Sequence, residues 1–152
     1  MKRALSLMLL TILACSGCNQ GEAGKDGGGG AKVADSAAMQ GTWTFVEVHE
    51  DGKVKEKEKT EGGKLEIAGD KMTLTPPGDK KPNVLTFKLD EAKKHIDLSM
   101  EKKEPNLGLY ELKGDDLRIV FCENNDSKER STKFETEPNG PNGVMFVLRR
   151  AK

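Results

Sequence analysis

Histidine, cysteine and aromatic side chains are scarce in this chain of 152 residues. It contains two His, three Cys, one Trp, one Tyr and five Phe. Neither His stands in a spacing typical of metal ligands, and the sequence contains no nucleophile elbow, HExxH helix or calcium-binding loop. Without a catalytic constellation, we expect the protein not to be an enzyme, and we expect neither a cofactor nor a metal site.

Net charge is also absent, because 25 basic residues balance 25 acidic ones. Removing residues 1–14 takes away Lys2 and Arg3 but no acid, which leaves 23 basic against 25 acidic residues. A nucleic-acid-binding domain needs a surplus of cations on one face, so we expect no nucleic-acid partner. With 33% charged and 35% hydrophobic residues, the chain favours a small core under a charged surface.

No hydrophobic run is long enough to cross a membrane as a helix. The N-terminal apolar stretch, from Leu5 to Leu13, has nine residues, whereas a spanning helix needs roughly 20. It follows the basic residues Lys2 and Arg3. A short basic segment followed by an apolar run is typical of an export signal. Because cysteines come directly after it, residues 1–14 resemble a bacterial lipoprotein signal. In such signals a Cys after a small residue is acylated and becomes the first residue of the mature protein.

Two cysteines fit the position of lipid attachment. Cys15 has Ala14 directly before it and the apolar Ile12 three residues before it, whereas Cys18 follows two small residues. We favour Cys15 and retain Cys18 as the alternative. The membrane would then be a partner through acyl chains. Neither cysteine precedes the Asp that commonly retains lipoproteins at the inner membrane, which implies an outer-membrane address facing the periplasm or the cell surface.

Residues 15–37 are rich in Gly, Ala, Asp and Lys, with four consecutive glycines at 27–30. Almost none of these side chains can be buried, so this segment is predicted to be a flexible tether. The sequence therefore divides into a signal at 1–14, a tether at 15–37 and one domain at 38–152.

Within the domain, apolar residues alternate with polar ones at a period of two. Trp43 and Phe45, for example, stand between Thr42 and Thr44. This alternation is typical of half-buried antiparallel strands. Such runs lie at 42–45, 64–67, 71–75, 85–89, 95–100, 110–112, 117–121 and 144–150, with a weaker one at 132–135.

Short turns separate these runs, because Gly69 and Gly114 allow tight hairpins at 68–71 and 113–116. Eight or nine strands in an open sheet would leave a hazardous exposed edge. Closing the sheet removes the edge, and eight strands enclose a space that side chains or one small ligand can fill. We therefore predict an all-β fold, an antiparallel up-and-down barrel of about eight strands.

Gly41-x-Trp43 opens the first predicted strand of this domain, and Arg149-Arg150 close the last. This start and end resemble those of lipocalins. In lipocalins the first-strand Trp plugs the barrel base and a late basic residue stacks on it, a cation–π contact. The resemblance implies a base motif of Gly41, Trp43 and Arg149.

A longer pattern covers residues 38–152. It includes Leu65-x-Ile67-x-Gly69-Asp70-Lys71, Lys94-x-Ile96-Asp97-Leu98 and Gly108-x-Tyr110-x-Leu112-x-Gly114-Asp115. This pattern is similar to an uncharacterised lipocalin-like bacterial domain family expanded in planctomycetes. The segment 130–134, Arg-Ser-Thr-Lys-Phe, departs from the family, which usually has a Pro there. The family has no established activity, so the resemblance implies a lipocalin-like fold and export but no reaction.

Two hypotheses of function follow for the cell envelope. In the first, the barrel binds a small apolar or amphipathic molecule between apolar side chains on separate strands. The candidates to line that site are Phe45, Leu74, Phe87, Leu98, Tyr110, Ile119 and Phe146. In the second, side chains fill the barrel, which acts without a ligand as a structural or protein-interaction module with an envelope protein partner.

Overall fold

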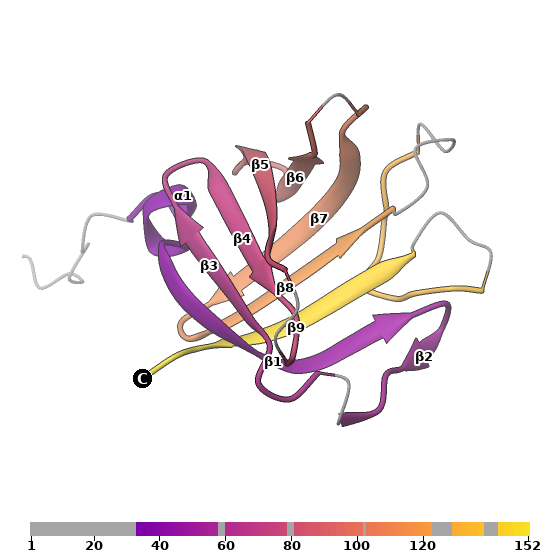
Figure 1. The fold of residues 1–152 in the computed structure, drawn as a ribbon. Helices are drawn as coiled ribbons and strands as arrows, with labels where there is room; N and C mark the ends of the chain where they lie inside the picture. The colour runs from indigo at the N-terminus through magenta and orange to yellow at the C-terminus, as the bar shows by residue number, and fades with distance from the viewer. Residues whose placement is uncertain (1–32, 58–59, 79–80, 102, 123–128, 139–142) are drawn as a thin grey trace, which may run out of the picture. The chain divides into compact units, whose positions relative to one another are not determined.

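The alternating runs form antiparallel strands that pair with their neighbours along the chain (Figure 1). The structure, a computed structural model, describes residues 33–57, 60–78, 81–101, 103–122, 129–138 and 143–152. Its elements in these ranges are α1 (Asp35–Ala38), β1 (Gly41–Glu50), β2 (Lys53–Val54), β3 (Lys64–Ala68), β4 (Lys71–Thr75), β5 (Asn83–Asp90), β6 (His95–Ser99), β7 (Asn106–Lys113), β8 (Asp116–Phe121) and β9 (Val144–Arg150).

Eight of these strands form a closed ring. Starting from β1, the order is β3, β4, β5, β6, β7, β8 and β9, and β9 pairs back onto β1. Every pair of neighbours is antiparallel. The two-residue β2 pairs only with the end of β1. The predicted all-β, antiparallel up-and-down barrel of about eight strands is confirmed.

A β-bulge in β1 decides which of its side chains face the interior. The bulge lies between Phe45 and Glu47, where Val46 is an extra residue relative to β9. An extra residue reverses the alternation of side chains across a strand. Trp43 therefore faces inward before the bulge and Val48 faces inward after it, a change of phase that simple alternation does not predict.

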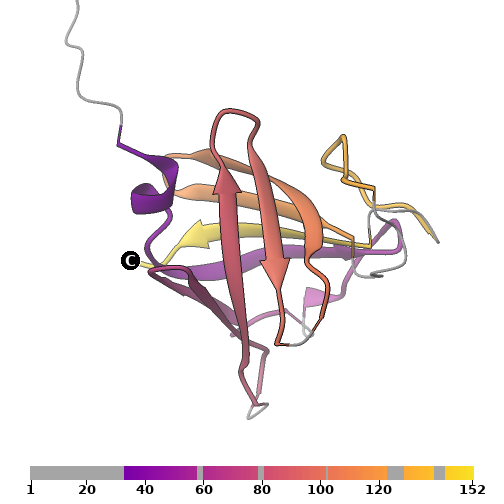
Figure 2. The same ribbon diagram turned by 90° about the horizontal axis from the view of Figure 1, so that it is seen from above.

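The short helix α1 lies at the end of the barrel where β1 begins and the C-terminus emerges (Figures 1 and 2). Gln40, between α1 and β1, exchanges two hydrogen bonds with Gly69, in the β3–β4 turn. The Gly69 N–H donates to Gln40 Oε1 at 2.8 Å, and Gln40 Nε2 donates to the Gly69 carbonyl at 3.1 Å. Residues 35–37, which the sequence assigned to the tether, belong to the folded part, because residues 32–152 form one unit.

The half of the barrel next to α1 is filled by a packed apolar core. Burial of one large apolar side chain contributes about 1.5–3 kcal/mol, so this core provides much of the stability. The side chains in it with no exposed surface are Met39, Trp43, Ile96, Tyr110, Leu117 and Leu148.

The predicted weak strand at 132–135 is absent, and this expectation was wrong. β8 and β9 already pair with each other along their whole length, so neither offers a free edge to this segment. Residues 129–138 are held by side chains instead. Arg130 donates to the carbonyls of Ile96 at 3.1 Å and Gly108 at 2.7 Å, and Arg118 lies 5.0 Å from the Phe134 ring centre.

Candidate functional site

A cavity of about 420 Å³ occupies the end of the barrel opposite α1. Its walls come from the last residues of β1, β4, β6 and β8 and the first residues of β5, β7 and β9. All of these strand ends point away from α1, so the barrel has one closed and one open end. The cavity volume lies at the small end of the range of about 300–1,000 Å³ that small-molecule sites occupy.

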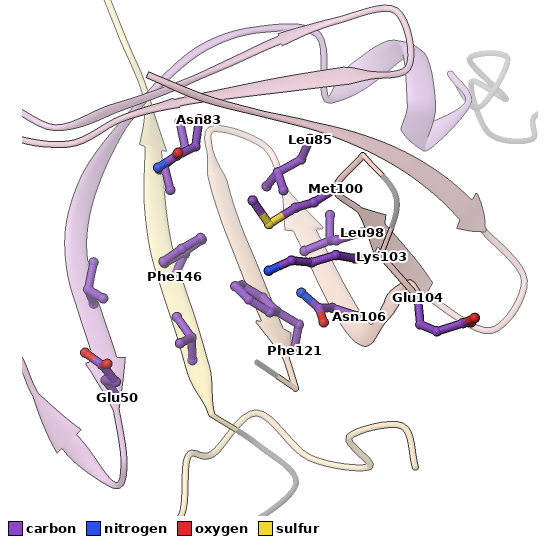
Figure 3. Close-up of a pocket in the computed structure, with 13 residues that line it drawn as sticks. Glu50, Asn83, Leu85, Leu98, Met100, Lys103, Glu104, Asn106, Phe121 and Phe146 are labelled. Atoms are coloured by element: carbon purple, nitrogen blue, oxygen red, sulfur yellow. The ribbon is translucent and has the colours of Figure 1, made fainter. Parts of the chain in front are cut away.

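Apolar side chains form the walls of this cavity (Figure 3). Phe146 is central to them, because its ring makes edge-to-face contacts with Phe45 at 5.2 Å and with Phe121 at 5.4 Å between ring centres. Such pairs add about 0.5–1.5 kcal/mol to the energy of burial, so they stabilise this wall. The apolar lining residues are Val48, Leu74, Leu85, Leu98, Met100, Phe121, Val144 and Phe146.

Polar side chains lie around the mouth of the cavity. They are Glu50, Asn83, Lys103, Glu104 and Asn106. Glu50 is engaged in an ion pair with Lys55, which follows β2. In Figure 3 the Lys103 side chain extends over the cavity toward Phe146, whereas the Glu104 carboxylate is directed away from it. An apolar interior with a few polar groups at its rim suits an amphipathic ligand.

Three of the seven residues predicted to line a ligand site do line the cavity, namely Leu74, Leu98 and Phe146. Phe87, Tyr110 and Ile119 belong instead to the buried core. Phe45 packs against Phe146 and also borders a second hollow of about 490 Å³ beside β1 and residues 60–64. The prediction identified the inward-facing positions but not how far along the barrel each one lies.

At the closed end, the predicted base motif is present with one correction. Arg150, rather than Arg149, stacks on Trp43, and its guanidinium lies 4.2 Å from the ring centre. Trp43 pairs directly with Arg150 across the β1–β9 ladder, and directly opposed residues share a face of the sheet. Arg149 is exposed on the other face, where it pairs with Asp116 at 3.0 Å. At Gly41 a Cβ would lie 3.4 Å from the Arg150 guanidinium.

A buried carboxylate fastens α1 to the barrel. Asp35 is 7% exposed, accepts a hydrogen bond of 2.6 Å from the Tyr110 hydroxyl and pairs with Lys94. Burial and this hydrogen bond raise the pKa of Tyr110 well above its ordinary value. The Ser36 N–H donates to Glu91 at 3.0 Å, which lowers the pKa of that carboxyl. These contacts hold α1 against one end of the barrel, which α1 closes.

Sequence reasoning missed most residues of the cavity. Val48 was hidden by the bulge, and Lys103 and Asn106 lie in and after a loop without a strand pattern. The alternation in β5 and β8 already placed Leu85 and Phe121 inward, so that signal was available. The missed lining residues are Val48, Glu50, Asn83, Leu85, Met100, Lys103, Glu104, Asn106, Phe121 and Val144.

Several sequence predictions concern other kinds of site. Cys15 and Cys18, with the signal and most of the tether, lie outside the described residues. In the described ranges, no group of three or more His, Cys, Asp or Glu side chains is arranged to hold a metal ion. The same part of the chain contains no helix that is both long and apolar enough to cross a membrane.

Comparison of the chain with protein-family models, curated proteins and solved structures gave no match in any of the three. The resemblance to a lipocalin-like family therefore stays a prediction from the sequence.

Proposed function

We propose that this chain is an exported, lipid-anchored protein of the cell envelope whose lipocalin-like barrel binds a small apolar or amphipathic molecule. The observation that carries the binding part is the cavity of about 420 Å³ at the open end, with aromatic and aliphatic walls and a polar rim. The packed core and α1 close the other end, so a ligand would enter from one side only.

The filled-barrel alternative predicts that aromatic side chains occupy the whole interior. Trp43 and Phe87 lie in the packed core, while the rings of Phe121 and Phe146 stand along the cavity wall. The space between the walls favours a ligand over a purely structural barrel. Removal of an apolar molecule from water into such a space contributes about 25 cal/mol for each Å² of apolar surface buried.

The export and anchoring part rests on the sequence of residues 1–18. A short basic segment, a nine-residue apolar run and a Cys after Ala14 together support acylation at Cys15, with Cys18 as the alternative. A domain held in this way at the outer membrane would meet amphiphilic molecules of the envelope.

Native mass spectrometry tests the binding part directly. Residues 33–152, which include α1 and the entire ring of strands, would be exported to a bacterial periplasm and purified without detergent. We expect the native mass to exceed the denatured mass by that of one small molecule. A native mass equal to the denatured mass, together with no uptake of added amphiphiles, would contradict ligand binding.

A further inference from the structure

The loop between β6 and β7 places one cation over the mouth of the cavity. The Lys103 N–H donates to the Met100 carbonyl at 3.2 Å, which closes a turn directly after β6. Met100 and Lys103 both line the cavity. Figure 3 shows the Lys103 side chain reaching inward over the apolar walls, with its nitrogen on the side of Phe146.

Neither carboxylate at the mouth forms an ion pair with this cation. Glu50 pairs with Lys55, and Glu104 is directed away from the cavity (Figure 3). Among the described residues we find no ion pair for Lys103. Asn83 and Asn106 add amide groups to the rim, and an amide can donate hydrogen bonds to an anion. Among the charged side chains that line the cavity, Lys103 is therefore the one directed over the apolar walls without a carboxylate partner.

We propose that the cavity selects single-chain amphiphiles with an anionic head, a carboxylate or a phosphate. This inference rests on the proposed ligand-binding function and specifies its ligand class. The head would pair with the Lys103 ammonium and the Asn106 amide at the rim. The alkyl chain would extend between Leu85, Leu98 and Phe146, which line the cavity.

The size of the selectivity follows from the position of Lys103. Its side chain lies at the exposed rim, so water and salt screen the ion pair. An exposed ion pair of this kind changes a binding constant by about 1.5- to fivefold. Affinity for the alkyl chain should depend on the walls, and preference among heads should depend on Lys103.

The test uses calorimetric titration of residues 33–152 with four ligands that share one alkyl chain: dodecanoate, dodecyl phosphate, dodecanol and dodecyltrimethylammonium. We expect the two anions to bind about 1.5- to fivefold more tightly than dodecanol, and the cation to bind most weakly. Their relative affinities show which anionic head is preferred, and either order fits the proposal.

Two variants test whether Lys103 causes the preference for anionic heads. Lys103→Met should keep the affinity for dodecanol and lose the preference for anions, and Lys103→Glu should favour the cation. The matched control is Lys81→Met, because Lys81 is exposed at the same end of the barrel but does not line the cavity. It should keep the wild-type preference.

Three results would overturn parts of this account, and they can be told apart. Equal binding of dodecanol and the anions by the wild-type protein would contradict the anionic ligand class alone. A preference that survives in Lys103→Met would contradict the role of Lys103. No binding of any of the four ligands would contradict the proposed function itself.

Discussion

The Arg150 guanidinium lies 4.2 Å from the centre of the Trp43 ring and joins the two ends of the folded chain. Its Nη1 donates to the Gln40 carbonyl at 2.9 Å, and its Nη2 donates to the Ala38 carbonyl at 2.6 Å. The Trp43 indole in turn donates to the Met39 carbonyl at 2.9 Å. The last strand, the first strand and α1 are therefore held together at one point.

Replacing Arg150 with Ala should destabilise the protein by about 2–4 kcal/mol. The change removes a cation–π contact worth about 0.5–2 kcal/mol and leaves two carbonyls near the barrel base without their charged donor. Denaturant unfolding followed by the fluorescence of Trp43, the single Trp of the chain, measures the loss.

Arg149→Ala is the matched control, because Arg149 is the adjacent residue on the opposite face of β9 and pairs with the exposed Asp116. Its cost should stay below about 1 kcal/mol. If the two variants are equally destabilised, the assignment of the base contact to Arg150 is incorrect.

The second prediction concerns alkaline pH and the single Tyr of the chain. Tyr110 is buried and its hydroxyl donates to Asp35, so its folded-state pKa is raised. A raised pKa contributes stability that is complete below the unfolded value of about 10 and is lost as the pH rises toward the folded value. Above pH 10 the loss from this group should approach about 1.4 kcal/mol per pH unit.

Ultraviolet absorbance of tyrosinate reads this group without interference from other tyrosines. The native protein should show little ionisation at a pH where the chain in denaturant is already ionised. Tyr110→Phe should lower stability at neutral pH and flatten its decline above pH 10, relative to the wild type. A native Tyr110 that ionises near pH 10 would contradict both its burial and its contact with Asp35 in solution.

A third prediction concerns lipid attachment. In a bacterium that processes lipoproteins, metabolic labelling with a palmitate analogue should label the full chain, and Cys15→Ser should abolish the label while Cys18→Ser retains it. The reverse pattern would assign the modification to Cys18. A wild-type chain that is exported but carries no label would contradict the anchored location.

The barrel could be predicted from the sequence because the alternation of apolar residues survives in almost every strand. Leu65 and Ile67 or Ile96 and Leu98 are buried as their spacing indicates. Gly69 and Gly114 adopt the positive φ angles, 63° and 59°, that tight turns require. Each of these signals depends only on residues that are close together along the chain, so it can be recognised in the sequence.

The cavity depends on features that are not local. Alternation says that Tyr110 and Phe146 both face inward, but their distance from α1 decides that the first is core and the second is cavity wall. The bulge at Val46 changes the phase of β1 with no sequence marker. The closure of the barrel end next to α1 depends on Asp35. The sequence prediction placed Asp35 in the tether because of the composition of residues 15–37.

The sequence prediction assigned the contact with Trp43 to Arg149, whereas Arg150 makes it. This error, unlike those in the cavity, did not come from a feature that the sequence hides. Leu148 is buried and faces inward, so the inward position that follows it in β9 is Arg150. The alternation rule was sufficient to identify the correct residue. The resemblance to a family motif fixed the kind of contact but not the register.

The central claim is that the open end of the barrel binds a small molecule, and blocking the cavity tests it most directly. Leu85→Trp would place a large ring inside the cavity, whereas Val84→Trp is the matched control, since Val84 precedes it on β5 and is 56% exposed. Both variants would first be shown to unfold cooperatively. Leu74→Trp, on the adjacent strand, replaces Leu85→Trp if the latter does not fold.

Calorimetric titration with dodecanoate is the measurement. We expect one molecule to bind to the wild type and to Val84→Trp with similar affinity, and binding to Leu85→Trp to fall at least about tenfold, because the ring occupies the space that the alkyl chain needs. Equal affinity in all three proteins would place binding outside the cavity, and no binding to the wild type would contradict the account.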